Sequence, residues 1–142
     1  MGKFKDIYEL IATFGAMVGS YSYTSIKEFA NITNKADRGE YLFLLNSDNV
    51  RITNRYTGRT LSKMVFEIFI IQNHSQDAFE IDIAEIQDAC FDKMNAFFYE
   101  MNKPNSDYFA LIEWDSRMVR NTTPNCFAGV KFDLTIETAN NL

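Results

Sequence analysis

Residues 128–137 read Ala-Gly-Val-Lys-Phe-Asp-Leu-Thr-Ile-Glu, and apolar and polar side chains alternate strictly from Val130 to Glu137. This period of two is typical of an antiparallel strand with one face on a core and one face in water. Upstream stands a different pattern, an apolar stripe at steps of three and four residues: Ile83, Ile86, Cys90, Met94, Phe97 and Met101. Such a stripe predicts an amphipathic helix. Together the two patterns indicate an α+β fold, with helices covering one face of an antiparallel sheet.

The ends of this central helix carry recognisable signals. Asp82 followed by Glu85 fits a capping box, so we predict that the helix begins at Asp82. Lys103 then falls in the last turn, and Pro104 is expected to end the helix. A second amphipathic helix is predicted from Phe4 to Val18, with Gly19 as its stop.

About five strands of unequal length are expected, over residues 40–45, 50–56, 60–72, 108–117 and 128–137. The third is long, and at about 3.3 Å per residue it would span about 40 Å. It must therefore bend, or carry a projecting hairpin beyond the body of the domain. Phe69 and Ile71 predict that its far end is buried on both faces.

The composition is that of one globular domain over residues 1–142. Apolar residues make up 46% and aromatic residues 15%, with only 2 Pro and 6 Gly. The polar stretch 20–38 is expected to be irregular, an arm or a loop with a short helical turn near residues 26–30. The first residues do not resemble a secretory signal, and no run reaches the roughly 18 apolar residues of a membrane span. Cys90 and Cys126 are expected to be reduced thiols, with Cys90 in the core.

Charge is segregated along the chain although the net charge is only −5. One short stretch carries only basic charges, Arg51, Arg55, Arg59 and Lys63. The stretch after residue 76 carries only acidic ones, Asp77, Glu80, Asp82, Glu85, Asp88 and Asp92. The basic stretch could be a solvated sheet edge, a contact with an acidic neighbouring copy, or a surface that meets DNA in a pore. A ring forms when one patch meets the other on the next subunit and the rotation closes.

The sequence predicts no enzyme, no cofactor and no metal site. His74 is the only histidine and is expected at the surface, in a loop between a strand and a helix. Glu113 and Asp115 lie two apart on one strand face, which an inverting glycosidase could use, but a solvated strand face explains them as well. The functional hypotheses are a ring-forming structural protein, a cytosolic α+β binding or dimerisation module, and a hydrolase using Glu113 and Asp115.

The order of elements resembles that of the tail terminator, or tail-completion, proteins of tailed bacteriophages. The shared features are the helix Phe4–Val18, the hairpin Arg51–Lys63, the acidic-capped helix Asp82–Lys103 and the closing strand that ends in residues 129–136. The resemblance implies a ring, typically a hexamer, at the end of the tail tube or at the head–tail junction of the virion. Its partners would be tail-tube and neck proteins, with weak contact to passing DNA and no membrane. The subunits would be made in the host cytoplasm, and head–tail connectors and other tail proteins share the same features.

Overall fold

The computed structural model describes residues 3–24, 33, 39–46, 48–56, 60–105, 109–121 and 126–138. Within these residues two helices and six strands appear, in the order α1 (Lys3–Val18), β1 (Ser20–Thr24), β2 (Tyr41–Asn46), β3 (Arg51–Tyr56), β4 (Thr60–Asn73), α3 (Glu80–Asn105), β5 (Phe109–Asn121) and β6 (Phe127–Thr138). The predicted α+β class is confirmed, and the five predicted strands, β2 to β6, lie within a few residues of their expected bounds.

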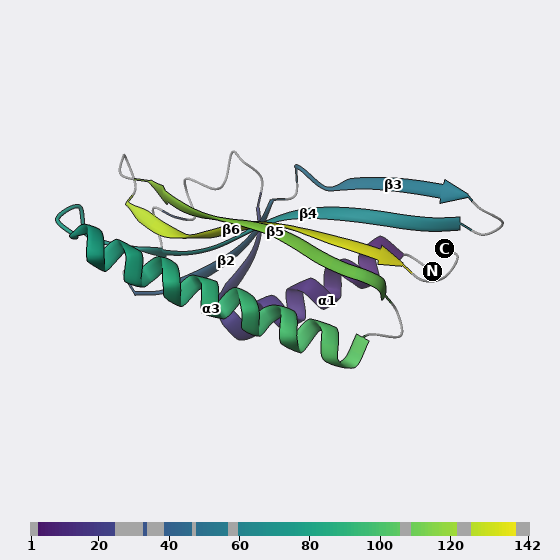
Figure 1. The fold of residues 1–142 in the computed structure, drawn as a ribbon, viewed down its shortest axis with the longest axis horizontal. Coiled ribbons are helices and arrows are strands. Elements are labelled where there is room, and N and C mark those ends of the chain that lie inside the picture. The colour runs from purple at the N-terminus through teal and green to yellow at the C-terminus, as the bar shows by residue number, and fades with distance from the viewer. Residues whose placement is uncertain are drawn as a thin grey trace.

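The strands form one sheet in the order β1-β2-β4-β6-β5, with β3 also paired to β4 (Figure 1). β4 organises the sheet because β2 and β3 follow one another along the same edge of it. Residues 68–72 of β4 pair with β2, and residues 60–65 pair with β3. β6 runs along the other edge of β4, and β5 lies outside β6. All of these pairs are antiparallel except β1 with β2, which is parallel.

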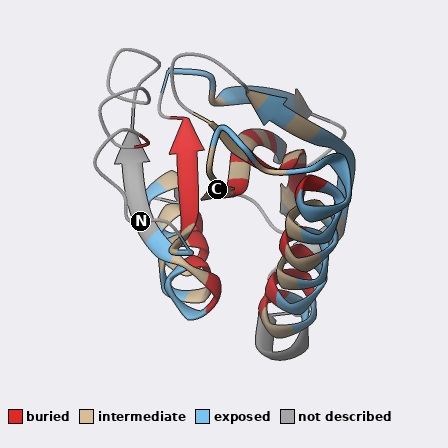
Figure 2. Ribbon diagram, turned by 90° about the vertical axis from the view of Figure 1, so that its left-hand side faces the viewer, coloured by how far each residue is buried: buried red, intermediate tan, exposed pale blue. Residues whose placement is uncertain are grey.

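α1 and α3 lie side by side on one face of the sheet (Figure 2). Their apolar stripes face β2, β4 and β6, and the predicted alternation of β6 is confirmed because Val130, Phe132, Leu134 and Ile136 are all buried in this core. The ring of Phe97 on α3 lies at the centre, 5.2 Å from Phe43 and 6.1 Å from Phe132 between ring centroids. At the edge, Trp114 on β5 stacks on Phe98 with centroids 3.7 Å apart.

The predicted start of α3 is wrong by two residues. The backbone N–H of Phe79 donates to Asp82 Oδ2 at 3.1 Å, so Phe79 is the N-cap residue and Asp82 is the third residue of the helix. Asp82 thus supplies the acidic half of a capping box and reaches back toward the start of the helix. The predicted end at Pro104 is also too early, since α3 continues to Asn105.

The stretch 20–38 is not irregular at its start, because Ser20–Thr24 forms β1. The expected turn at residues 26–30 lies outside the described residues. The β3–β4 hairpin is present and is paired up to Tyr56 and Thr60. Its tip, residues 57–59, also lies outside the described part of the chain, so the projection of this hairpin stays a prediction.

The sheet face away from the helices has two different halves. One half is apolar, with Leu42, Leu44 and Ile71 buried against Phe69, Val119 and Phe127. This confirms that the far end of β4 is buried on both faces. Asn73 at the end of β4 donates from Nδ2 to the carbonyl of Thr33 at 2.6 Å, which places Thr33 next to this half. The other half is charged.

Candidate interaction surfaces

The charged half of the open face begins at the basic hairpin. Arg51 on β3 and Lys63 on β4 are exposed, and they lie on the same face because Arg51 pairs with Val65 and Lys63 with Thr53. Of the two other predicted basic residues, Arg59 and the side chain of Arg55 lie outside the described residues. The structure therefore places two of the four predicted basic side chains.

The sheet brings acids of β5 and β6 next to these two bases. Arg51 and Lys63 line a depression of about 590 Å³ together with Glu113, Asp115 and Asp133. Glu113 and Asp115 lie on one strand face, as predicted, and both are exposed. The basic stretch of sequence is thus part of a mixed field in the folded chain. Sequence reasoning missed this because the three acids are 50 or more residues away from Arg51 along the chain.

Like charges also face one another across the strands in this half. Asp133 on β6 is directly opposite Glu67 on one side and Asp115 on the other. Lys131 relieves part of this repulsion, since its Nζ lies 3.2 Å from Glu67 Oε2 and 3.3 Å from Asp133 Oδ1. Burial alone would raise the pKa of Glu67, but hydrogen bonds from Asn46 and Lys131 outweigh it and lower that pKa. The face of β6 that was predicted to be exposed to solvent is only half-exposed at Lys131 and Asp133.

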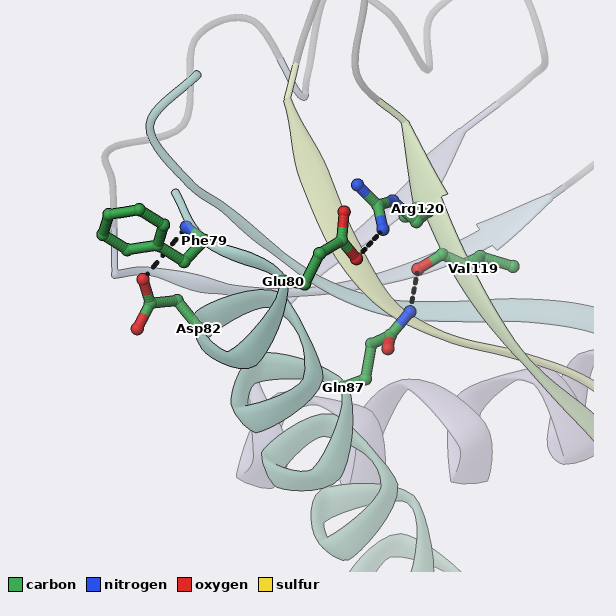
Figure 3. A network of polar contacts seen from close by, with 6 residues as sticks. All are labelled: Phe79, Glu80, Asp82, Gln87, Val119 and Arg120. Atoms are coloured by element: carbon green, nitrogen blue, oxygen red, sulfur yellow. Dashed lines mark hydrogen bonds and ion pairs between the residues drawn. The ribbon is translucent and has the colours of Figure 1, made fainter. Parts of the chain in front are cut away.

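The second candidate surface is the acidic start of α3 (Figure 3). All four predicted contact residues there are exposed: Asp77, Glu80, Asp82 and Glu85. Two of them already have partners within the chain. Asp82 caps the helix, and Glu80 Oε2 lies 2.5 Å from Arg120 Nη1 on β5. Contact with Arg120 lowers the pKa of Glu80. This ion pair could not be predicted from sequence, because it joins residues 40 apart.

Two large apolar side chains next to these acids are exposed to solvent. Phe79 is 75% exposed and Ile81 is 65% exposed. An apolar pair rimmed by carboxylates is the usual make-up of a contact surface rather than of a solvated helix end, because interfaces combine an apolar centre with a polar rim.

The basic hairpin and the acidic helix start lie at opposite ends of the long axis of the molecule (Figure 1). Ten residues of β4 separate Lys63 from Asn73, which is about 33 Å of extended strand, and the acids follow Asn73. Because the Debye length in physiological salt is about 8 Å, the two surfaces cannot interact within one chain.

The remaining candidate side chains are the two cysteines and the only histidine. Cys90 is a free thiol in the core, as predicted, and burial raises its pKa to about 12 against an opposing effect of Lys93. Cys126 is half-buried, and its carbonyl accepts a hydrogen bond from the N–H of His74. His74 is half-buried rather than at the surface, and its Nδ1 lies 2.8 Å from the carbonyl of Ser75.

Comparison of the sequence with protein-family models and with curated proteins gave no match. No helix in the described part of the chain is long and apolar enough to cross a membrane.

Proposed function

We propose that this chain is a non-enzymatic structural subunit of a bacteriophage virion that forms a ring at the end of the tail tube or at the head–tail junction. The observation that carries the proposal is the placement of the basic hairpin and the acidic helix start at opposite ends of one elongated subunit. Surfaces of opposite charge that cannot meet within a chain can meet between copies, head to tail. Head-to-tail contacts close into rings when the rotation between subunits permits.

The chemistry of the two ends supports the same proposal. Electrostatic complementarity sets the partner and the register of a contact, while apolar burial supplies most of the affinity. Arg51 and Lys63 would supply the basic side, and Asp77 and Glu85 the acidic side. Phe79 and Ile81 would supply the apolar centre. A hexamer, and partners in the tail tube and neck, follow from the resemblance to tail terminator proteins.

The test is native mass spectrometry of the wild-type chain and of a double variant, Arg51→Glu with Lys63→Glu. We expect the wild type to form closed rings, alone or after addition of a tail-tube protein. The double variant should lose the ring because two attractive contacts per interface become repulsive. Because both side chains share a depression with Glu113, Asp115 and Asp133, an Arg51→Gln, Lys63→Gln variant is measured as well, which removes the attraction without adding carboxylates. Circular dichroism checks that both variants are folded.

Lys5→Glu is the control, because Lys5 is exposed on α1, which covers the face of the sheet opposite to the one that carries Arg51 and Lys63. It should assemble like the wild type. A ring that survives reversal of Arg51 and Lys63 in low salt would remove this contact from consideration.

A binding or dimerisation module unrelated to phage is the second candidate function. It is favoured by one observation, the exposed edge of β5, which in the described sheet order pairs only with β6. A stable dimer with no larger species, unaffected by changes at Arg51 and Lys63, would support this candidate over the ring.

A further inference from the structure

Within the described part of the chain, β5 is an edge strand whose outer side pairs with no other strand. In the pairing of β4 with β6, the N–H of His74 donates to the carbonyl of the opposite residue, Cys126. Backbone groups along an antiparallel strand point alternately to its two neighbours. The backbone N–H and C=O groups of even-numbered residues of β6 therefore form hydrogen bonds with β4, and those of odd-numbered residues form hydrogen bonds with β5.

The register between β5 and β6 determines which backbone groups of β5 point away from the sheet. Odd-numbered residues of β5 stand opposite odd-numbered residues of β6, for example Asp115 opposite Asp133. Their backbone groups are used within the sheet. The backbone groups of Trp114, Ser116 and Met118 consequently point outward, where a further strand can pair with them.

The side chains around Ser116 are complementary to themselves under a twofold rotation. The order is Trp114-Asp115-Ser116-Arg117-Met118. If a second copy of β5 pairs antiparallel about an axis through Ser116, Asp115 faces Arg117 of the other copy, and Trp114 faces its Met118. An axis through Asp115 or Arg117 would instead place two like charges face to face.

The two apolar residues of this segment, Trp114 and Met118, are exposed in the single chain. Trp114 is 41% exposed and Met118 is 47% exposed, both on the helix side of the sheet. On α3, Gln87 donates to the carbonyl of Val119, and Phe98 stacks on Trp114, so α3 runs antiparallel to β5 along this edge (Figure 3). Phe91, 37% exposed, lies between these two contact points on α3. Trp114, Met118 and Phe91 thus give the edge an apolar strip that a second copy would cover.

We propose that two copies of this chain associate through β5, antiparallel about Ser116, into one continuous sheet with all helices on the same side. Asp115 and Arg117 would form two identical ion pairs across the axis, at positions where antiparallel side chains approach most closely. This twofold contact uses neither the basic hairpin nor the acidic helix start. Because Asp115 lines the same depression as Arg51 and Lys63, the twofold contact is tested with those two side chains unchanged.

The test is sedimentation equilibrium in an Asp77→Arg, Glu85→Arg background, in which the acidic side of the ring contact is reversed and the surroundings of Asp115 are unchanged. We expect a mass that rises with concentration toward twice 16.4 kDa. Asp115→Arg alone, or Arg117→Asp alone, should weaken the dimer about tenfold or more, because both ion pairs become repulsive. The combined variant exchanges the two charges and should restore the dimer. Glu113→Arg is the matched control, since the same charge change falls opposite Val119, and it should leave the dimer within about threefold of the background.

Two further readouts report on the register. Trp114 is the only tryptophan, so its emission should shift to shorter wavelength as the dimer forms. Ser116→Cys should cross-link rapidly on oxidation, because residues on the axis would have Cα atoms about 5.5 Å apart, within the range of a disulfide. Arg117→Cys should cross-link much more slowly. A monomer at all concentrations, a dimer insensitive to both charge reversals, or equal cross-linking at residues 116 and 117 would overturn the proposal.

Discussion

At the scale of single residues, Gly129 leaves the least room for a side chain among the described glycines. A Cβ added there would lie 2.1 Å from the carbonyl oxygen of Ile70 and 2.7 Å from the Cα of Ile71. These are backbone atoms of β4, which cannot move without separating β4 from β6. Gly15 on α1 is close instead to the ring of Phe43, at 2.5 Å, and a ring can shift more easily than a strand.

Gly129→Ala is therefore expected to destabilise the chain by about 3 kcal/mol, the upper part of the usual range for overpacking. Gly15→Ala should cost less, about 1 kcal/mol, because better helix propensity offsets part of the clash. Urea unfolding followed by circular dichroism gives both values. Equal stability of Gly129→Ala and wild type would mean that β4 and β6 are further apart than described.

At the scale of elements, one carboxylate joins three segments on the open face. Glu67 on β4 accepts hydrogen bonds from Asn46 at 2.8 Å and Asn49 at 3.3 Å, and it pairs with Lys131 on β6. Because these partners lower its pKa below the ordinary 4.5, the folded state holds the ionised form more strongly than the unfolded chain does. The resulting stability is fully present above pH 4.5 and is lost as the pH falls through the folded pKa.

Glu67→Gln should lower the free energy of unfolding by about 1 kcal/mol at pH 7, since a charge-assisted hydrogen-bond network is removed. Below the folded pKa of Glu67 the variant and the wild type should converge. Chemical unfolding at several pH values between 7 and 3 measures this, with Glu113→Gln as the exposed control. A constant difference between Glu67→Gln and wild type at every pH would show that the charge of Glu67 is not responsible.

Some of the elements could be predicted from the sequence, and others could not. α3 and β6 were predicted because their apolar periods run without interruption for many residues, and each ends up with one buried face. β1 was missed because the run Ser20–Thr24, in which Tyr alternates with Ser, is only five residues long, and its pairing depends on β2, some twenty residues away. The start of α3 was misplaced because Asp82 makes a good N-cap in sequence but serves as the third helical residue in space.

The candidate surfaces were predictable only in part, for a related reason. The run of acids at the start of α3 is local, so its exposure followed from the helix. The surroundings of Arg51 depend on β4 pairing with β3 and β6 at once, which places Asp133 and Asp115 near the basic hairpin. The pairing of Glu80 with Arg120 likewise required the position of β5.

At the scale of the whole molecule, the two proposed contacts should respond differently to salt. The ring contact depends on exposed charges, which salt screens within about 3 Å at 1 M. The β5 contact depends on backbone hydrogen bonds and on Trp114 and Met118 as well as on charge. Raising the salt concentration from about 0.05 M to about 1 M should therefore dissociate the ring and leave the dimer intact. Light scattering across this range gives the mass of the species in solution and so separates the ring contact from the dimer contact. Loss of the ring and of the dimer at the same salt concentration would argue against independent contacts.

The position of β6 has a consequence for the newborn chain. β6 is made after β4 and β5, yet it lies between them and supplies the only described partner of β5. Until the ribosome has released residues 127–138, β5 has nothing to pair with and the inner surface of β4 stays half uncovered. The sheet should consequently form only after β6 has been made, and a nascent chain stalled before Phe127 should be sensitive to proteases and should recruit chaperones.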